Sequence, residues 1–206
     1  FTPEQIHLVE TSYLNMKRNG ANLSRLKKLQ LIRIQMKLSK LNLKFSENVL
    51  AETNAYELHV TDKNQLSGLP DGLLEAAAQT AKSRKKDGWV FTLQFPSYGP
   101  FMKYADNRTL REQMYRASSA RGNNGNKHDN NKLIREIVNL RLKMAQLLEY
   151  NTYADYVLEE RMADSASKVE AFLNQLHQAS KPIAQKELNE VRTLAQSLGF
   201  EGELMP

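Results

Sequence analysis

Histidine side chains are the first residues of this sequence that could bind a metal or transfer a proton. The four histidines are His7, His59, His128 and His177. A zinc peptidase needs two imidazoles one helical turn apart, with a glutamate beside the first that acts as a general base. No two of these histidines have that spacing. The histidines therefore predict no metal site.

Paired carboxylates are the second pattern that could support acid–base chemistry. They occur at Glu159–Glu160 and at Glu187 with Glu190, in each case on a polar helix face near lysine or arginine. Such pairs are typical of solvated helix surfaces, and we interpret His7 with Glu10 as a surface pair of the same kind. We predict that no residue of this chain is catalytic, binds a cofactor or ligates a metal.

A polar loop and an aromatic row complete the candidates. Residues 122–126 contain two glycines but lack the lysine and hydroxyl of a phosphate-binding loop, so they predict a mobile loop, with a solvated His128 beyond it. Three aromatic residues are spaced three apart, which is typical of core or interface packing, with a stacking platform for bases as the alternative. They are Tyr98, Phe101 and Tyr104.

Two helices are predicted to precede these candidates. Thr2 before Pro3, with Gln5 three residues after Thr2, indicates a capping box that begins a helix reaching about Lys17. A second helix of about 30 residues, or roughly 45 Å, should run from Ser24 to about residue 53. Five of its apolar residues share one face. They are Leu26, Leu29, Ile32, Met36 and Leu43.

A small sheet is predicted from two alternating segments, Tyr56–Val60 and Trp89–Phe95, with the helix 70–86 between them covering one face. Four alternating residues of the second segment should bury one side of it. They are Trp89, Phe91, Leu93 and Phe95. We interpret this segment, which holds the only tryptophan, as a structural junction with Trp89 packed between sheet and helix. Contact of Trp89 with a substrate is the alternative.

Helices are predicted for the rest of the chain. Ser97 should cap a short helix, and Asn107 a helix over 109–121 with Leu110, Met114 and Ala117 facing inward. Residue 129 or 130 should cap a helix to about Glu149, with a row of five buried apolar residues: Leu133, Ile137, Leu140, Met144 and Leu147. Thr152 should begin another helix. Ser167 and Glu170 indicate a capping box for a last helix that bends near Pro182 and ends at Gly199.

The fold class that follows is mainly α, a multi-helix scaffold with long antiparallel helices and one small β element. We expect residues 1–206 to form a single α-rich unit, since no linker or repeat interrupts them. The first residue is Phe1 and the last three are apolar, which we interpret as cut ends. The sequence has no cysteine, which excludes disulfides and thiolate metal sites, and it has no apolar run of membrane-spanning length. We expect a cytoplasmic protein without a membrane partner.

Net charge is +6 in 206 residues, a value that often indicates nucleic-acid binding. The basic residues lie at 27–44 and 82–86, separated by acids and apolar faces rather than forming a continuous stripe. Solvated helix faces are the favoured interpretation, and we predict no nucleic-acid partner.

Long stretches of the sequence nevertheless resemble one family. "GWVFTLQFPSYGPFMKYADNRTLREQMYRASSARG" (88–122) is similar to the thimet oligopeptidase family of zinc metallopeptidases. The likeness continues through "HDNNKLIREIVNLRLKMAQLLEYNTYADYVLEERMADSASKVEAFLNQL" (128–176) and extends back through "LKFSENVLAETNAYELHVTDKNQLSGLP" (43–70), so that it covers nearly the whole chain. The run Asn48–Ala55 favours the peptidyl-dipeptidase branch over the oligopeptidase branch.

This resemblance implies a mostly helical fold of two lobes that enclose a long, narrow channel for short peptide substrates. The family binds zinc through an H-E-x-x-H helix and a downstream glutamate, and it uses later tyrosine and histidine residues to bind substrate. The zinc lowers the pKa of a bound water, and the motif glutamate takes its proton. None of these residues occurs here. The resemblance therefore implies the front and middle of a peptidase that continues beyond residue 206, inactive and metal-free by itself, with the remainder of its polypeptide as partner.

Two other classes of protein remain open at this point. One is a stand-alone helical interaction module with a basic face, and the other is a nucleic-acid binder. The missing zinc motif is common to all three, so it does not discriminate between them. An H-E-x-x-H motif encoded after Pro206 would decide for the peptidase.

Overall fold

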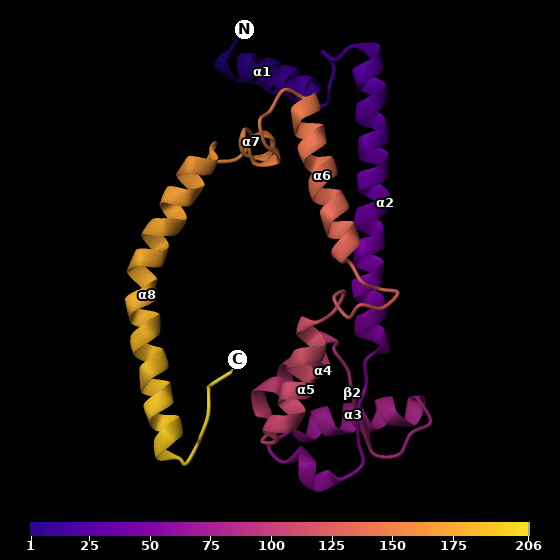
Figure 1. The fold of residues 1–206 in the computed structure, drawn as a ribbon, viewed down its shortest axis with the longest axis vertical. Helices are drawn as coiled ribbons and strands as arrows, with labels where there is room; N and C mark the ends of the chain where they lie inside the picture. The colour runs from indigo at the N-terminus through magenta and orange to yellow at the C-terminus, as the bar shows by residue number, and fades with distance from the viewer. Residues whose placement is uncertain (206) are drawn as a thin grey trace. The chain divides into compact units, whose positions relative to one another are not determined.

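The computed structural model describes residues 1–205, and it is mainly helical, as predicted (Figure 1). Contacts divide the chain into two compact units, Phe1–Lys143 and Met144–Pro206. The helices and strands of the first unit are α1 Pro3–Arg18, α2 Arg25–Ala55, β1 Leu58–Val60, the 3-10 helix η1 Lys63–Leu66, α3 Asp71–Ser83, β2 Trp89–Phe91, α4 Phe95–Tyr104 and α5 Arg108–Ser119. Helix α6, Asn131–Leu147, begins in the first unit, and α7 Tyr153–Leu158 and α8 Ala166–Ser197 belong to the second.

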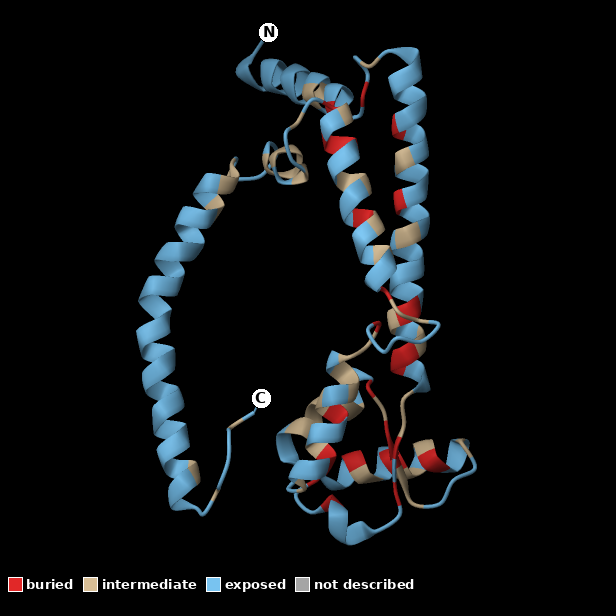
Figure 2. Cartoon of the chain, viewed as in Figure 1, coloured by how far each residue is buried: buried red, intermediate tan, exposed pale blue. Residues whose placement is uncertain are grey.

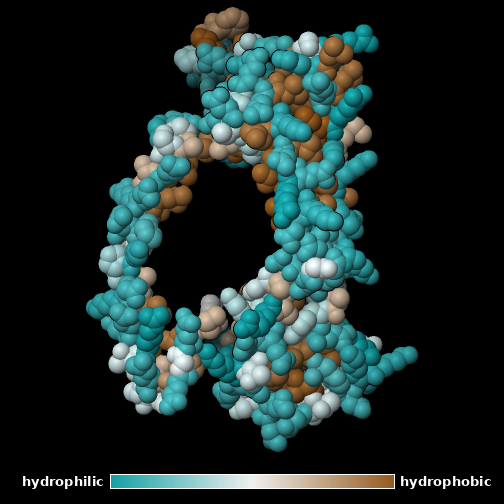
Figure 3. Space-filling model, viewed as in Figure 1, coloured by the Kyte–Doolittle hydropathy of each residue, from teal (hydrophilic) through white to brown (hydrophobic). Residues whose placement is uncertain are grey.

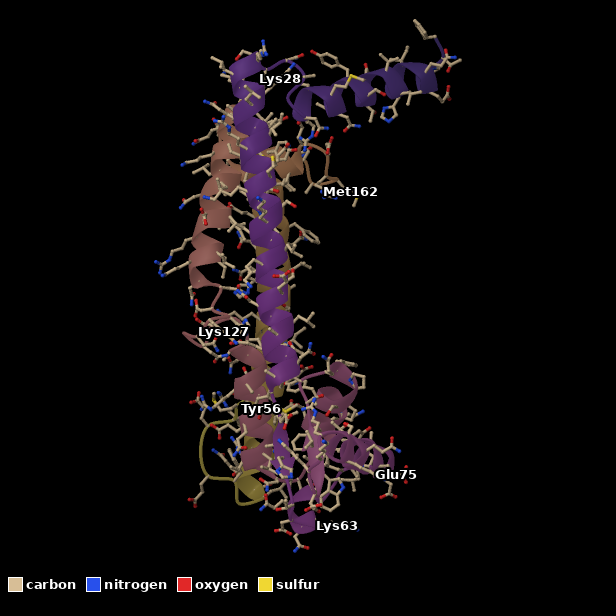
Figure 4. The ribbon with its side chains drawn as sticks, turned by 90° about the vertical axis from the view of Figure 1, so that its right-hand side faces the viewer. Lys28, Tyr56, Lys63, Glu75, Lys127 and Met162 are labelled. Carbon is tan, nitrogen blue, oxygen red and sulfur yellow. The ribbon has the colours of Figure 1, made fainter. Side chains whose placement is uncertain are left out.

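Helices α1 and α2 begin where the sequence indicates. The Gln5 backbone N–H donates to the Thr2 hydroxyl over 3.3 Å. The Thr2 backbone N–H donates to the side-chain oxygen of Gln5 over 3.0 Å, which confirms the capping box. Ser24 caps the first turn of α2, a helix of 31 residues. Figure 4 labels Lys28 and Tyr56 near its two ends.

The buried face of α2 is not the face that carries its regular row of apolar residues. The five residues of that row are all exposed, from Leu29 at 47% to Leu26 at 74%. Leu31 and Leu38 are buried instead, seven residues apart on another side of the helix. Residues 131–143 of α6 lie beside α2 in Figure 1, and Lys37 pairs with Glu136 between them. Helix α2 therefore carries two apolar stripes, and its neighbour in the first unit covers only one.

The main core of the first unit surrounds the two-stranded sheet (Figure 2). Strands β1 and β2 are antiparallel, with Leu58 opposite Phe91 and Val60 opposite Trp89. Helix α3 packs against β2, and α4 packs against α3 and α5. Phe91 and Phe101 are fully buried, with their ring centroids 4.7 Å apart in an edge-to-face contact. Leu110 and Met114 of α5 complete this core as predicted, with Ala117 partly buried against it.

The segment that contains the tryptophan turns from strand to helix earlier than predicted. Strand β2 ends at Phe91, and α4 begins at Phe95, which is 81% exposed. Proline is tolerated in the first turn of a helix, where no backbone N–H is needed, so Pro96 favours helix here. Ser97 consequently lies inside α4 and is not its cap, and its hydroxyl accepts the Thr92 N–H over 3.0 Å. Trp89 is half-buried and packs against the core, as the junction interpretation predicts.

The second unit is built around one long helix. A capping box between Thr152 and Asp155 begins α7, which contacts α8. The predicted capping box at Ser167 and Glu170 is wrong, because α8 already begins after Ser165. Pro182 lies within α8, and Figure 1 shows the helix curved. None of the 32 residues of α8 is buried.

Candidate functional site

The most extensively hydrogen-bonded polar cluster of the first unit is built around Glu52, near the end of α2. Its side chain is buried, and its carboxylate accepts hydrogen bonds from three groups of one loop. The donors are the Gly122 backbone N–H, the Asn124 amide over 2.9 Å and the Asn126 amide over 2.7 Å. We call these four residues the Glu52 cluster.

Two further contacts fix where this loop leaves and re-enters helix. Gly122 has a φ of +75°, and a β-carbon there would lie 2.8 Å from the Asn130 amide nitrogen, so the position requires glycine. The Asn130 backbone N–H donates to the Gly122 carbonyl over 2.7 Å. The end of α5 and the beginning of α6 are thereby held against each other.

Asn130 also joins the loop to α2. Its side-chain oxygen accepts from the Asn48 amide over 2.9 Å, and its amide nitrogen donates to the Phe45 carbonyl over 3.2 Å. Asn48 and Asn130 are only 2% and 1% exposed. Buried amides are retained where they are hydrogen-bonded, so this pair fixes the position of α6 along α2.

Arg121 and Asp129 reinforce the two ends of the loop. The Arg121 guanidinium donates to the Thr53 hydroxyl over 3.0 Å and to the Ser118 carbonyl over 2.9 Å. The Asp129 carboxylate accepts from the Gly125 N–H over 3.0 Å and from the Asn131 N–H over 2.8 Å. The hydrogen bond from Asn131 comes first among the causes that lower the pKa of Asp129, and those causes together outweigh burial, which raises it.

Electrostatically, Glu52 is an ionised acceptor. Burial is the largest single influence and raises its pKa, but the hydrogen bonds from Gly122, Asn124 and Asn126, with the nearby His128, together hold the pKa below its ordinary value. Both carboxylate oxygens already accept N–H donors. Glu52 is therefore suited to organising the loop rather than to taking a proton or binding a cation.

The sequence predicts a mobile loop and a solvated His128 here, and the structure differs from both expectations. Buried and half-buried groups of α2 hold the loop at several points. His128 is half-buried, and its Nδ1 atom is shielded from solvent without a hydrogen-bond partner. Figure 4 shows Lys127 on this loop. Sequence reasoning missed Glu52 because a lone glutamate in a long helix indicates a solvated face; the asparagines at 123, 124, 126 and 130 were the available signal.

The other histidines are far more exposed. His7 and His177 lie on exposed positions of α1 and α8, and the His59 ring lies 2.6 Å from the Asp87 carbonyl through Nε2. Among residues 1–205, no three His, Cys, Asp or Glu side chains are grouped so that they could hold a metal ion. The residues described here thus do not fit a zinc site.

The carboxylate pairs interact with neighbouring polar groups. The Tyr150 hydroxyl donates to Glu159, and Lys186 lies 3.8 Å from Glu190 one turn along α8. A further carboxylate, Glu57, pairs with Arg84 and Lys86. The hydrogen bond from Lys86 is the main cause that lowers the pKa of Glu57.

The aromatic row divides between core and surface. Phe101 is fully buried and Tyr98 packs against the same core, which agrees with the packing interpretation, while Tyr104 is 43% exposed. The basic residues of α2 precede its acids in the sequence, and two of them form ion pairs, Lys44 with Glu47 over 3.7 Å and Lys37 with Glu136 of α6. None of the helices within residues 1–205 has the length and apolarity needed to cross a membrane.

The chain is similar to known peptidases. Residues 101–206 match peptidase family M3. Over 202 residues the chain is 40% identical to oligopeptidase A of Haemophilus influenzae and 37% identical to oligopeptidase A of Escherichia coli. It is 25% identical over 203 residues to dipeptidyl carboxypeptidase of Escherichia coli. These alignments include 96–97% of this chain but only 30% of each relative, so the chain spans less than a third of their length.

Proposed function

Since this chain belongs to peptidase family M3, the thimet oligopeptidase family, we propose that it is a non-catalytic portion of a zinc-dependent metallopeptidase that cleaves short peptides. In this proposal residues 1–206 form one α-rich part of the helical lobe that encloses the substrate channel, and the polypeptide continues beyond residue 206. The observation that carries the proposal is the alignment with oligopeptidase A, which takes in 96% of this chain and 30% of the relative.

An oligopeptidase is a better parent than a peptidyl-dipeptidase. The run Asn48–Ala55 favours the peptidyl-dipeptidase branch, but identity over the whole chain is 36–40% to the bacterial oligopeptidases A and 25–26% to the bacterial dipeptidyl carboxypeptidases. Asn48 and Glu52, two polar residues of that run, form structural hydrogen bonds with Asn130 and with Asn124 of the loop before α6. Such residues report on the scaffold more than on the substrate.

Zinc, in this proposal, is bound by a part of the parent enzyme outside this chain. The residues described here do not fit a zinc site, so no catalytic step is assigned to them. Their contribution is a scaffold in which the Glu52 cluster holds α2, α5 and α6 together.

The partners and compartment follow from the same proposal. The parent would act on short peptides in the cytoplasm, without nucleic-acid or membrane partners. One plant relative, 36% identical, is named a probable cytosolic oligopeptidase A, which supports that compartment, and another, 37% identical, is named organellar. The ion pairs Lys37–Glu136 and Lys44–Glu47 neutralise part of the basic surface of α2, which weighs against a nucleic-acid interface.

The test compares two proteins, the full-length parent and the 206-residue chain. The parent should cleave short fluorogenic peptides, lose that activity to a zinc chelator and regain it with added zinc. The 206-residue chain should show no turnover under the same conditions. Metal-dependent cleavage by the chain alone, or a parent without chelator-sensitive peptidase activity, would contradict the proposal.

A further inference from the structure

An apolar stripe runs along α8 without a covering element among the described residues of the second unit. Phe172, Leu176 and Ile183 are 59%, 49% and 60% exposed. Val191 and Leu194 continue the same side of the helix, because separations of 4, 7, 8 and 3 residues keep successive side chains on one face. In Figure 3 the apolar side chains of α8 gather along one side of it. A stripe of this length indicates an interface.

The chain reverses direction at the end of this helix. Gly199 has a φ of +81°, its N–H donates to the Gln196 carbonyl, and the Phe200 N–H donates to the Ala195 carbonyl over 2.9 Å. This pair of hydrogen bonds is a Schellman motif, which ends a helix and redirects the chain. Figure 1 shows the segment after α8 running back in the direction opposite to the helix. Phe200 and Leu204 are half-buried, so this return has already begun.

One charge interrupts the stripe. Glu187 lies four residues after Ile183 and four before Val191, on the same face. Within residues 1–205 it has no hydrogen-bond or ion-pair partner, whereas its neighbour Lys186 pairs with Glu190. A carboxylate covered by another element needs a cation opposite it.

We propose that the polypeptide following residue 206 in the parent returns along α8 as an antiparallel amphipathic helix, with apolar residues on the α8 stripe and a lysine or arginine opposite Glu187. The proposal rests on the proposed function, since it requires a parent that continues beyond this chain. Consecutive helices joined by a short connection are usually antiparallel neighbours. The relatives, of which this chain matches only 30%, have ample length to supply such a helix.

A second copy of this chain is a poorer occupant of the stripe. Paired α8 helices would present the same stripe twice, and that stripe contains Glu187 but no cation. Two carboxylates would then be covered without a partner. The cation requirement therefore distinguishes the returning helix from self-association.

The experiment places a photo-crosslinking amino acid in the full-length parent at one of three stripe positions, Leu176, Ile183 or Leu194. Mass spectrometry then identifies the crosslinked peptide. Position 194 should crosslink to the peptide that lies nearest in sequence to residue 206, position 183 to a later peptide and position 176 to the latest. With a short connection and a helix as long as the stripe, all three peptides should lie within roughly 40 residues after residue 206. The peptide reached from position 183 should contain a lysine or arginine. Gln178, on the opposite face, is the matched control and should give little product.

Several results would overturn the inference. These are crosslinks between two parent molecules, crosslinks to residues before Met144, crosslinks to more distant sequence, and a reversed order of the three positions. Equal yields at Gln178 and Leu176 would also do so. Peptidase activity is measured separately on the unsubstituted parent, so an inactive parent with correctly ordered crosslinks would refute the proposed function while leaving the helix pairing intact.

Discussion

The sheet region of the first unit and helix α8 of the second are both amphipathic, yet the apolar side chains are buried in the first region and exposed in the second. Around β2, the side chains of Phe91, Phe101 and Met114 are fully buried by neighbours from within the first unit. Along α8 only Val169 among the large apolar side chains is half-buried, the others are at least 38% exposed, and no residue is buried. The first region can contribute stability within its own unit, whereas α8 needs a surface that the described residues of the second unit do not give it.

This contrast separates two kinds of amphipathic helix. Helix α3 packs against β2 and α4, so elements that follow it closely in the sequence cover its apolar face. Within its unit, helix α8 contacts the short α7, and its C-terminal segment turns back at Gly199. An isolated helix gains most of its stability from tertiary packing. We therefore expect α8 to be the less stable of the two regions in the 206-residue chain.

The largest effect should come from breaking the buried aromatic pair. Phe101→Ala removes a fully buried ring in contact with Phe91 and should lower the free energy of unfolding by about 3–5 kcal/mol. Phe172→Ala, the matched change on α8, should alter it by less than about 0.5 kcal/mol. Urea unfolding of both variants of the 206-residue chain measures the difference. Equal losses would show that α8 is as well packed as the sheet region.

Glu52 gives the next largest effect. Glu52→Gln leaves an uncharged side chain facing three N–H donors and should cost about 2–3 kcal/mol. Trypsin should then cleave faster after Lys127, because the loop is released. Glu47→Gln, on the exposed face of the same helix, is the control and should leave both readouts unchanged.

Acid should remove the advantage that Glu52 provides. Its folded-state pKa is lowered, so the stabilisation is complete above the unfolded pKa of about 4.3 and is lost as the pH falls through the lower folded value. The difference in unfolding free energy between wild type and Glu52→Gln should be constant from pH 6 to 8 and shrink below about pH 4. A difference that grows on acidification would mean that Glu52 is protonated in the folded chain.

The loop glycines offer a smaller and more selective test. Gly122→Ala adds a β-carbon 2.8 Å from Asn130, whereas Gly125→Ala, also at positive φ, meets no atom within 4 Å. Both substitutions incur the left-handed penalty of about 1–2 kcal/mol, and Gly122→Ala should cost about 1 kcal/mol more. Thermal unfolding compares the pair. Indistinguishable melting temperatures would show that the contact with Asn130 can relax.

The smallest effect is expected at Glu57. Its pairs with Arg84 and Lys86 are partly solvated, so Glu57→Gln should cost less than about 1 kcal/mol. The loss should diminish further as salt screens the pairs. A cost above that of Glu52→Gln would show that the surface carboxylate contributes more stability than the buried one.

Four helix beginnings were predictable from a capping sequence, whereas the caps expected at Ser97 and Ser167 were wrong, and burial partners were not predictable. Thr2, Ser24, Asn107 and Thr152 all cap helices as their patterns indicate. Helix α2 shows the limit: its sequence carries two apolar stripes, and periodicity alone cannot tell which of them a neighbour covers. The long-range contacts that decide this come from α6, about 100 residues later in the chain.

The Glu52 cluster was unpredictable for a related reason. A glutamate in a long helix indicates a solvated surface, and an asparagine-rich loop indicates mobility. Each signal is local, whereas Glu52 and Asn126 are 74 positions apart. Only the pairing of a buried acceptor with several amide donors converts two polar segments into one ordered element.

Chemical ageing is a consequence of how this loop is held. Asn124 precedes Gly125, a sequence prone to loss of the side-chain amide, because glycine leaves the next backbone nitrogen unhindered as it attacks the asparagine carbonyl. Here that nitrogen donates to Asp129 and the Asn124 amide donates to Glu52, so both reacting groups are restrained. We expect deamidation to require opening of the loop and then to place a second carboxylate against Glu52, which hinders reclosure. The amount of deamidated Asn124 in stored protein would thus increase with the number of times the loop has opened. A deamidation rate at Asn124 equal to that of an unstructured peptide would refute this protection.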